Sequence, residues 1–319
     1  MTHQTAEAPD QKMIADRAKR RRAWTRNWSL YLLMLPTVIY VVLLHYLPIG
    51  GLIISFKDYN SYQGIWGSPW AGLKHFITFV TMPNFWQIMG NTLLLSVYSI
   101  VLNTLLPIFL ALFINELRIK WFKKTVQTIS YAPYFISTVV VVGMLFSFSD
   151  LESGVFNTII KALGGQPTNI MESAVWFPTV YVISGLWQGL GWWAIIYIST
   201  LANVDPNLHE AAVLDGASRW KRIWHVNLPA IIPMAVIMFI ISIGNMLNVG
   251  FEKVYLMQTS GNLNMSEIIS TYVYRVSLMA KIPQYSYATA IGLFNSIINI
   301  ILLVIANYIS RKVGETSLW

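Results

Sequence analysis

The sequence predicts an all-α membrane protein with six transmembrane helices, and three observations carry this prediction. The chain of 319 residues is 55% hydrophobic and only 11% charged, whereas soluble domains carry about 25% charged residues. Its apolar residues fall into runs long enough to cross a bilayer, which needs about 20 residues. Most Lys and Arg residues stand beside these runs, so the net charge of +8 is typical of membrane topology and not of a nucleic-acid surface.

The six apolar runs are expected to be helices, because backbone polar groups in hydrocarbon must be hydrogen-bonded within the protein. Outer-membrane strands would alternate in polarity over about 10 residues, and these runs do not alternate. The expected spans are about 29–55, 90–115, 126–148, 177–202, 229–249 and 288–310. The first run is longer than the roughly 7–15 apolar residues of a secretory signal, so we interpret it as a retained anchor.

The chain is expected to have two regions: a basic cytoplasmic segment, 1–28, and a transmembrane domain, 29–319, with a polar loop at 203–228. The basic run at 19–22 suits an anchor against anionic lipid, with nucleic-acid binding as the alternative.

The positions of Lys and Arg predict the orientation, because cytoplasmic loops carry an excess of them. With a cytoplasmic N-terminus, the inside segments hold 16 of the 22 Lys and Arg residues and the outside segments hold 6. This bias places both termini and the 203–228 loop in the cytoplasm.

The polar loop carries clear helix boundaries. Asp205 can cap free backbone N–H groups and Pro206 suits the first helical position, while Gly216 is a natural stop in the left-handed conformation. A helix of about ten residues between them would be roughly 15 Å long. Ser218 can cap a second short helix, and Pro229 then opens the fifth span.

This loop resembles the EAA loop of ABC-importer permeases. Glu210, Ala211, Ala212, Gly216, Leu228 and Pro229 fall at the spacing of that motif, and Val226 stands where Ile is usual. The resemblance implies the type I ABC importer permease fold, with a cytoplasmic coupling helix that docks into an ATPase. The residues expected to couple to the ATPase are Asp205, Leu208, Glu210, Ala211, Ala212, Asp215, Gly216, Leu228 and Pro229.

Other segments are similar to the polysaccharide and oligosaccharide branch of the carbohydrate-importer permeases. They include 46–48, 56–60, 64–70, 72–76, 91–92, 115–118, 127–131, 271–275, 285–290 and 318–319. This resemblance implies a bacterial inner-membrane protein that pairs with a second homologous permease, two ATPase subunits and an extracytoplasmic solute-binding protein. Mg-ATP would bind the ATPase partners, and no cofactor is expected on this chain. The resembling branch includes importers of alginate, of pectin fragments and of xylan-derived aldouronates. Among these, an acidic, alginate-like oligosaccharide is the expected substrate, since Lys253, Arg275 and Lys281 lie near the outer ends of the last two spans.

Polar side chains within the spans predict the substrate route, because they are costly in a bilayer unless they pair or line a water-filled path. Amides suit sugar hydroxyls and aromatic rings suit sugar C–H faces. The predicted pathway residues are Gln188, Trp192, Trp193, Tyr197, Asn245, Asn248, Glu252, Asn295 and Asn299. Asn245, Asn248 and Glu252 are expected on one helical stripe. The alternative is that these groups join neighbouring helices.

Two other functions compete with this interpretation. A membrane-embedded glycan-processing enzyme would need a positioned base, nucleophile or metal cluster, but the five His residues are scattered and no phosphate-binding Gly-rich motif is present. No metal site is expected, and the chain is expected not to be an enzyme. An amino-acid or phosphate importer is the second alternative, against which the long outer loop at 57–89 argues.

Overall fold

The computed structural model describes residues 27–313 and 317, in which helices are joined by turns and loops and the only extended pairing is an isolated β-bridge between Lys57 and Trp70. The all-α fold is therefore confirmed. Predictions for the basic run at 19–22 and for 318–319 lie outside the described residues. The chain divides into two compact units, residues 1–54 with 59–68 and residues 55–58 with 69–319.

The described part of the first unit is dominated by an apolar helical segment. Its elements are α2 (Trp28–Val41), the π-helical turn η1 (Val42–Tyr46), α3 (Leu47–Ile49), the start of the 3-10 helix η2 (Gly50–Phe56), and the short α4 (Gly64–Gly67). No side chain of α2 is buried by the described chain. A helix that is apolar on all sides needs a nonaqueous environment, and α2 belongs to a segment long and apolar enough to cross a membrane.

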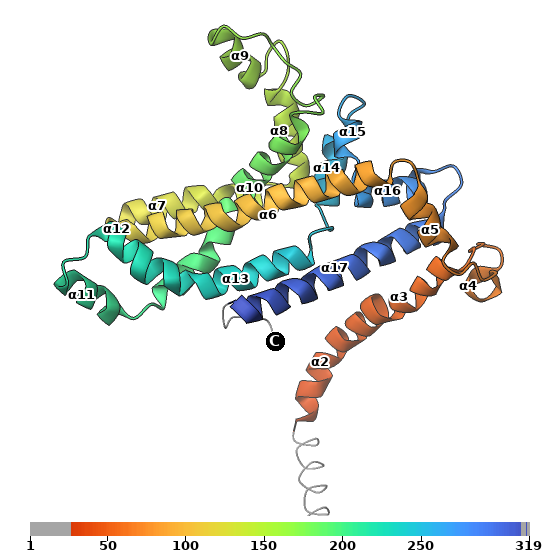
Figure 1. Ribbon diagram of the computed structural model, residues 1–319, viewed down its shortest axis with the longest axis horizontal. Helices are drawn as coiled ribbons and strands as arrows, with labels where there is room; N and C mark the ends of the chain where they lie inside the picture. The colour runs from red at the N-terminus through yellow and green to blue at the C-terminus, as the bar shows by residue number, and fades with distance from the viewer. Residues whose placement is uncertain (1–26, 314–316, 318–319) are drawn as a thin grey trace, which may run out of the picture. The chain divides into compact units, whose positions relative to one another are not determined.

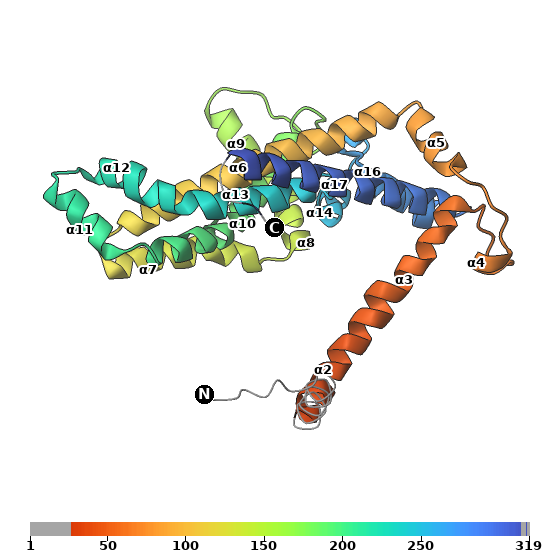
Figure 2. The same cartoon turned by 60° about the horizontal axis from the view of Figure 1, so that its bottom comes forward.

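The second unit is a bundle of long helices with shorter ones at its ends (Figure 1). In chain order its helices are α5 (Lys74–Thr81), α6 (Phe85–Glu116), α7 (Lys120–Tyr131), η3 (Ala132–Phe135), α8 (Thr138–Phe148), α9 (Val155–Ala162), α10 (Phe177–Ala202), α11 (Pro206–Leu214), α12 (Arg219–Arg222), η4 (Ile223–Asn227), α13 (Leu228–Gly244), α14 (Phe251–Met257), α15 (Leu263–Ser266), α16 (Ile269–Tyr274), η5 (Arg275–Met279) and α17 (Tyr285–Val313). Helices α6 and α10 pack together, as do α13 and α17 (Figure 2).

Three apolar clusters hold this bundle together. One surrounds Leu95 and joins α6, α8, α10 and α14; a second surrounds Ile291 and joins α5, α6, α16 and α17. The third surrounds Tyr197 and joins α6, α10, η4 and α13. Close helix approach also depends on small residues: a Cβ on Gly191 of α10 would lie 2.1 Å from the Ser130 carbonyl oxygen of α7. The long helix α6 is therefore the common wall of the unit.

Four helical segments in the described chain are long and apolar enough to cross a membrane: Trp28–Phe56, Phe85–Glu116, Arg219–Gly244 and Tyr285–Lys312. The segments Lys120–Phe135 and Thr138–Phe148 form a fifth only if the bent pair counts as one span. Helix α10 has 26 residues but is not among these segments. The count of six spans stays a prediction.

The expected span at 126–148 is not one continuous helix, because the chain bends by 96° between its two helices. Pro133 lacks a backbone donor and lies in η3, where the first helix ends. Ile136 is extended, and the Ser137 side chain accepts from Val140 N and starts α8. Gln188 Nε2 donates to the Ile136 carbonyl oxygen at 2.7 Å, so a side chain of α10 satisfies a backbone group that the break exposes.

The fifth span also differs from its expected bounds of 229–249. The helical segment runs from Arg219 to Gly244, so Pro229 does not open it. The π-helical turn η4 precedes Pro229 and accommodates the missing donor of that proline without a break. At the other end, Leu247 N donates to Asn299 Oδ1 at 3.0 Å, and this bond to α17 holds the chain outside the helix.

Candidate functional site

Helix α11 has the boundaries that its local sequence predicts. The Asp205 carboxylate accepts from Asn207 N at 2.9 Å and caps the first turn. At the other end Gly216 has φ +73°, Gly216 N donates to Val213 O and Ala217 N donates to Ala212 O. This pair of hydrogen bonds is the Schellman motif, which needs a residue in the left-handed conformation and therefore favours glycine.

Most of α11 is exposed, including several apolar side chains. Leu208 is 55% exposed and Leu214 is 87% exposed. Glu210 and Ala211 are exposed and Ala212 is half-buried. Of the other residues expected to couple to the ATPase, Asp205, Asp215, Gly216 and Pro229 are exposed and Leu228 is half-buried. An exposed helix with Leu and Ala side chains presents an apolar surface that a partner groove can cover.

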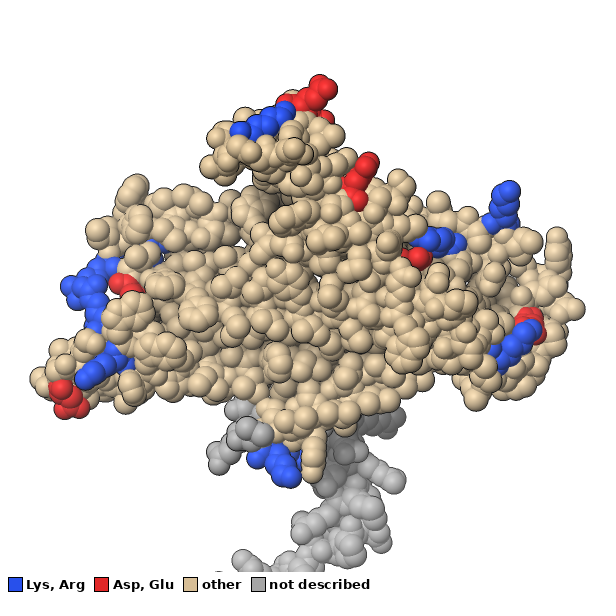
Figure 3. Space-filling view, turned by 45° about the horizontal axis from the view of Figure 1, so that its top comes forward, with Lys and Arg blue, Asp and Glu red and all other residues tan. Residues whose placement is uncertain are grey.

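The segment after α11 is anchored in the bundle. Ile223 and Asn227 are buried, and Asn227 Nδ2 donates to Glu116 Oε1 at 3.4 Å, at the end of α6. On the face in Figure 3, basic side chains gather at the end that carries α7, α11 and α12, and the middle of the bundle shows few charges. The end of the polar loop is therefore joined to the long helix α6.

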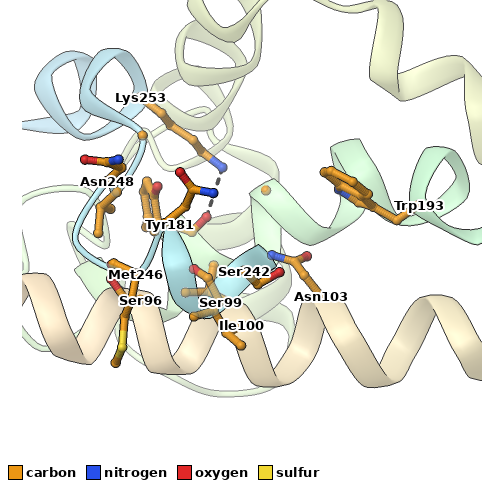
Figure 4. Close-up of a pocket in the computed structure, with 15 residues that line it drawn as sticks. Ser96, Ser99, Ile100, Asn103, Tyr181, Trp193, Ser242, Met246, Asn248 and Lys253 are labelled. Atoms are coloured by element: carbon orange, nitrogen blue, oxygen red, sulfur yellow. Dashed lines mark hydrogen bonds between the residues drawn. The ribbon is translucent and has the colours of Figure 1, made fainter. Parts of the chain in front are cut away.

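A polar cavity lies within the bundle, between α6, α10, the end of α13 and α14 (Figure 4). Its volume is about 290 Å³. A second cavity of about 270 Å³ shares Asn103, Trp193 and Asn245 with it and reaches Tyr197. The two cavities are therefore neighbours that share part of their lining.

The predicted pathway residues did not include the side of the first cavity that α6 forms. Ser96, Ser99 and Asn103 of α6 line the first cavity. Their spacings of three and four residues put them on one helical face, and the same spacing in the apolar run at 90–115 is the sequence feature that identifies them.

Four predicted pathway residues line the two cavities: Trp193, Tyr197, Asn245 and Asn248. Asn245 Nδ2 also donates to the Ile241 carbonyl oxygen at 3.0 Å. The expected stripe of Asn245, Asn248 and Glu252 is wrong, because α13 ends at Gly244 and Glu252 belongs to α14. Glu252 is exposed and does not line either cavity.

The other predicted pathway residues join helices. Trp192 stacks on Tyr134 with ring centroids 4.3 Å apart, and Gln188 bonds at the break before α8. Asn295 Nδ2 donates to Asn248 Oδ1 at 2.9 Å, while Asn299 accepts from Leu247 N. These contacts favour the alternative that polar side chains within the bundle join neighbouring segments.

Lys253 contributes the charge of the first cavity. Its side chain is 8% exposed and extends from α14 to α10, where Nζ donates to the Tyr181 carbonyl oxygen at 2.9 Å. Figure 4 shows this bond. The same ammonium lies 5.0 Å from the centroid of the Tyr181 ring. Among the described residues, no carboxylate forms an ion pair with Lys253.

The other two cations that suggested an acidic substrate are placed differently. Arg275 Nη1 lies 2.8 Å from Glu267 Oε1. Burial raises the pKa of the Glu267 carboxyl above its ordinary value, and the Arg275 charge offsets only part of this rise. Lys281 is exposed and lies outside both cavities. Of the three, only Lys253 lines the first cavity. The described residues contain no cluster of three or more His, Asp or Glu side chains suited to a metal ion.

Residues 104–315 match the family described as the binding-protein-dependent transport system inner membrane component. The chain is 42% identical over 290 residues to the polygalacturonan/rhamnogalacturonan transport system permease protein YteP of Bacillus subtilis (strain 168), covering 91% of this chain and 90% of that protein. It is 40% identical over 297 residues to protein LplB of the same organism, covering 93% of each chain.

Solved structures agree with the sequence relatives. The crystal structure of a bacterial alginate ABC transporter in complex with alginate pentasaccharide-bound periplasmic protein includes a chain that is 34% identical and superimposes with a TM-score of 0.85. The match covers 93% of this chain and 99% of that chain. With the apolar helices described above, these likenesses show that the chain belongs to the inner-membrane permease components of binding-protein-dependent ABC transporters, which are not themselves enzymes.

Proposed function

We propose that this permease forms half of the pathway by which an acidic oligosaccharide is imported, and that ATP hydrolysis on partner subunits drives it. The observation that carries the substrate class is the polar cavity, where amides, hydroxyls, an indole and one cation come together inside an apolar bundle. Amides and hydroxyls pair with sugar hydroxyls, and aromatic faces suit sugar C–H groups. The relatives named for polygalacturonan/rhamnogalacturonan and for alginate transport support an acidic glycan.

The proposed coupling element is α11. Its exposed Leu208 and Ala211 offer an apolar surface to a groove on an ATPase subunit, and Glu210 offers a charge at its edge. The bond from Asn227 to Glu116 supports transmission from this surface to α6. A second homologous permease, two ATPase subunits that bind Mg-ATP and an extracytoplasmic solute-binding protein complete the proposed assembly.

The proposed orientation has both termini in the cytoplasm. The excess of Lys and Arg in the inside segments supports it, as does the clustering of basic residues around α7 and α12. Helix α11 then lies on the side of the membrane where ATP is available.

The proposed substrate class is tested by reconstituting the whole transporter in liposomes with its solute-binding protein. ATP hydrolysis is measured with galacturonate and alginate oligosaccharides and with neutral malto- and arabino-oligosaccharides of the same length. We expect the acidic compounds to stimulate hydrolysis and the neutral compounds to have little effect. Stimulation by neutral sugars alone, or by an amino acid or phosphate, would reject the proposal.

A further inference from the structure

We propose that Lys253 binds a carboxylate of the passing saccharide and gives the cavity its preference for acidic sugars. This inference rests on the proposed function and adds a specificity-determining residue to it. The argument starts from the placement of Lys253: it is buried, it faces the polar cavity, and no described carboxylate neutralises it.

The fixed contacts of Lys253 leave hydrogen-bonding capacity free. An ammonium has three donors, and the Tyr181 carbonyl oxygen accepts from Nζ at 2.9 Å. The Tyr181 ring, 5.0 Å away, stabilises the cation without accepting a conventional hydrogen bond. Two donors therefore remain for a ligand in the cavity, and a carboxylate is the acceptor that matches the charge.

The backbone of α10 makes room for this ammonium. A Cβ on Gly185 would lie 3.0 Å from Lys253 Nζ, closer than real Cβ atoms normally approach another heavy atom. Glycine at this position therefore lets the charged end of Lys253 lie against the helix, within the cavity that Gly185 also lines. The position of the cation depends on two segments that are far apart in the sequence.

The rest of the cavity complements a uronic acid residue. Asn103 from α6 and Asn248 from the segment after α13 offer amides, and Trp193 from α10 offers an indole (Figure 4). No hydrogen bond joins the Asn103 amide to another described residue. A sugar in this space would meet neutral polar groups for its hydroxyls and a single cation for its carboxylate.

A purely structural role for Lys253 makes a different prediction. A neutral donor could also bond the Tyr181 carbonyl oxygen, whereas an unneutralised cation in a membrane bundle is costly unless it has a function. The two roles separate when the substrate changes and the protein does not. Methyl esterification removes the carboxylate charge of a uronic acid and leaves its hydroxyls in place.

The test uses the complete reconstituted transporter with a galacturonic acid tetrasaccharide and its fully methyl-esterified form. The measured quantity is the ratio of their half-maximal concentrations for ATPase stimulation, corrected for the affinity of the solute-binding protein for each compound. Lys253→Met and Lys253→Gln should lower the preference for the free acid about tenfold to a hundredfold, the value of a hydrogen bond to a charged group. Lys253→Arg should retain most of it.

Two further variants keep the test decisive. Lys281→Met removes an exposed cation outside the cavity and should leave the ratio unchanged. Gly185→Ala keeps the Lys253 charge but places a methyl group 3.0 Å from the position of Nζ, so Nζ must shift slightly and the preference should fall by less than in Lys253→Gln, even if Lys253→Met fails to assemble.

The possible failures are distinguishable. If neither galacturonate nor alginate oligosaccharides stimulate the wild-type transporter, the proposed substrate class fails, and this inference fails with it. If the wild type prefers the free acid and the assembled Lys253→Gln and Gly185→Ala variants keep that preference, only the role of Lys253 is overturned. Equal loss of stimulation by both tetrasaccharides would assign Lys253 to structure and also overturn the inference.

Discussion

Helix α11 and the polar cavity are built in opposite ways. All the backbone contacts that begin and end α11 come from residues 205–217, and most of its side chains are exposed. The cavity takes its lining from α6, α10, the end of α13 and α14, which are separated by long stretches of sequence. A docking surface can thus be local and self-contained, whereas a pathway through a membrane bundle needs several helices packed in one arrangement.

If α11 is a docking surface for an ATPase, it must face the cytoplasm, and this placement gives the largest expected effect. The chain has no native cysteine, so a single cysteine in place of an exposed serine reports accessibility. Ser61→Cys should react with an impermeant maleimide added outside intact cells, and Ser218→Cys should react only after the membrane is opened. This result is expected to be all or none, and the reverse pattern would contradict the proposed orientation.

Next in size is the effect of breaking the Schellman motif. Gly216→Pro cannot adopt φ +73° and removes the donor to Val213 O. Strain of about 1–3 kcal/mol at the end of α11 should distort the docking surface and reduce substrate-stimulated ATP hydrolysis about tenfold or more, with the complex still assembled.

Gly164 provides the matched control for that variant. It has φ +80° and its N–H donates to Lys161 O, so Gly164→Pro causes the same kind of local damage at the end of α9. Hydrolysis in the Gly164→Pro complex should stay close to wild type. Equal loss in both variants would mean that coupling does not depend specifically on α11.

The smallest expected effect distinguishes pathway amides from amides that join helices. Asn299→Leu leaves the buried Leu247 N–H without its acceptor, at a cost of about 1–3 kcal/mol; thermal stability of the detergent-solubilised complex should fall. Asn103→Leu breaks no described hydrogen bond, so stability should stay close to wild type while uptake of the saccharide falls. Stable Asn299→Leu protein and unchanged uptake by Asn103→Leu would reverse these assignments.

Local sequence chemistry correctly predicted the start and end of α11, because Asp205, Pro206 and Gly216 act on backbone groups within a few residues of themselves. Local sequence chemistry did not predict that α13 ends at Gly244. The run of apolar residues continues past that glycine, but the acceptor that holds Leu247 N outside the helix is on α17. A side chain about fifty positions away in the sequence does not enter a prediction from periodicity.

By itself, the sequence determined the helical membrane fold, the uneven distribution of charge and the boundaries of α11, since each depends on composition or on neighbouring residues. Only the tertiary structure decided which polar groups face a cavity and which join helices. Gln188 and Trp193 stand five residues apart on α10, yet one bonds the break before α8 and the other lines the cavity. That division depends on which residues lie opposite each side chain. The placement of Lys253 depends in the same way on Gly185, because a Cβ there would lie 3.0 Å from Nζ.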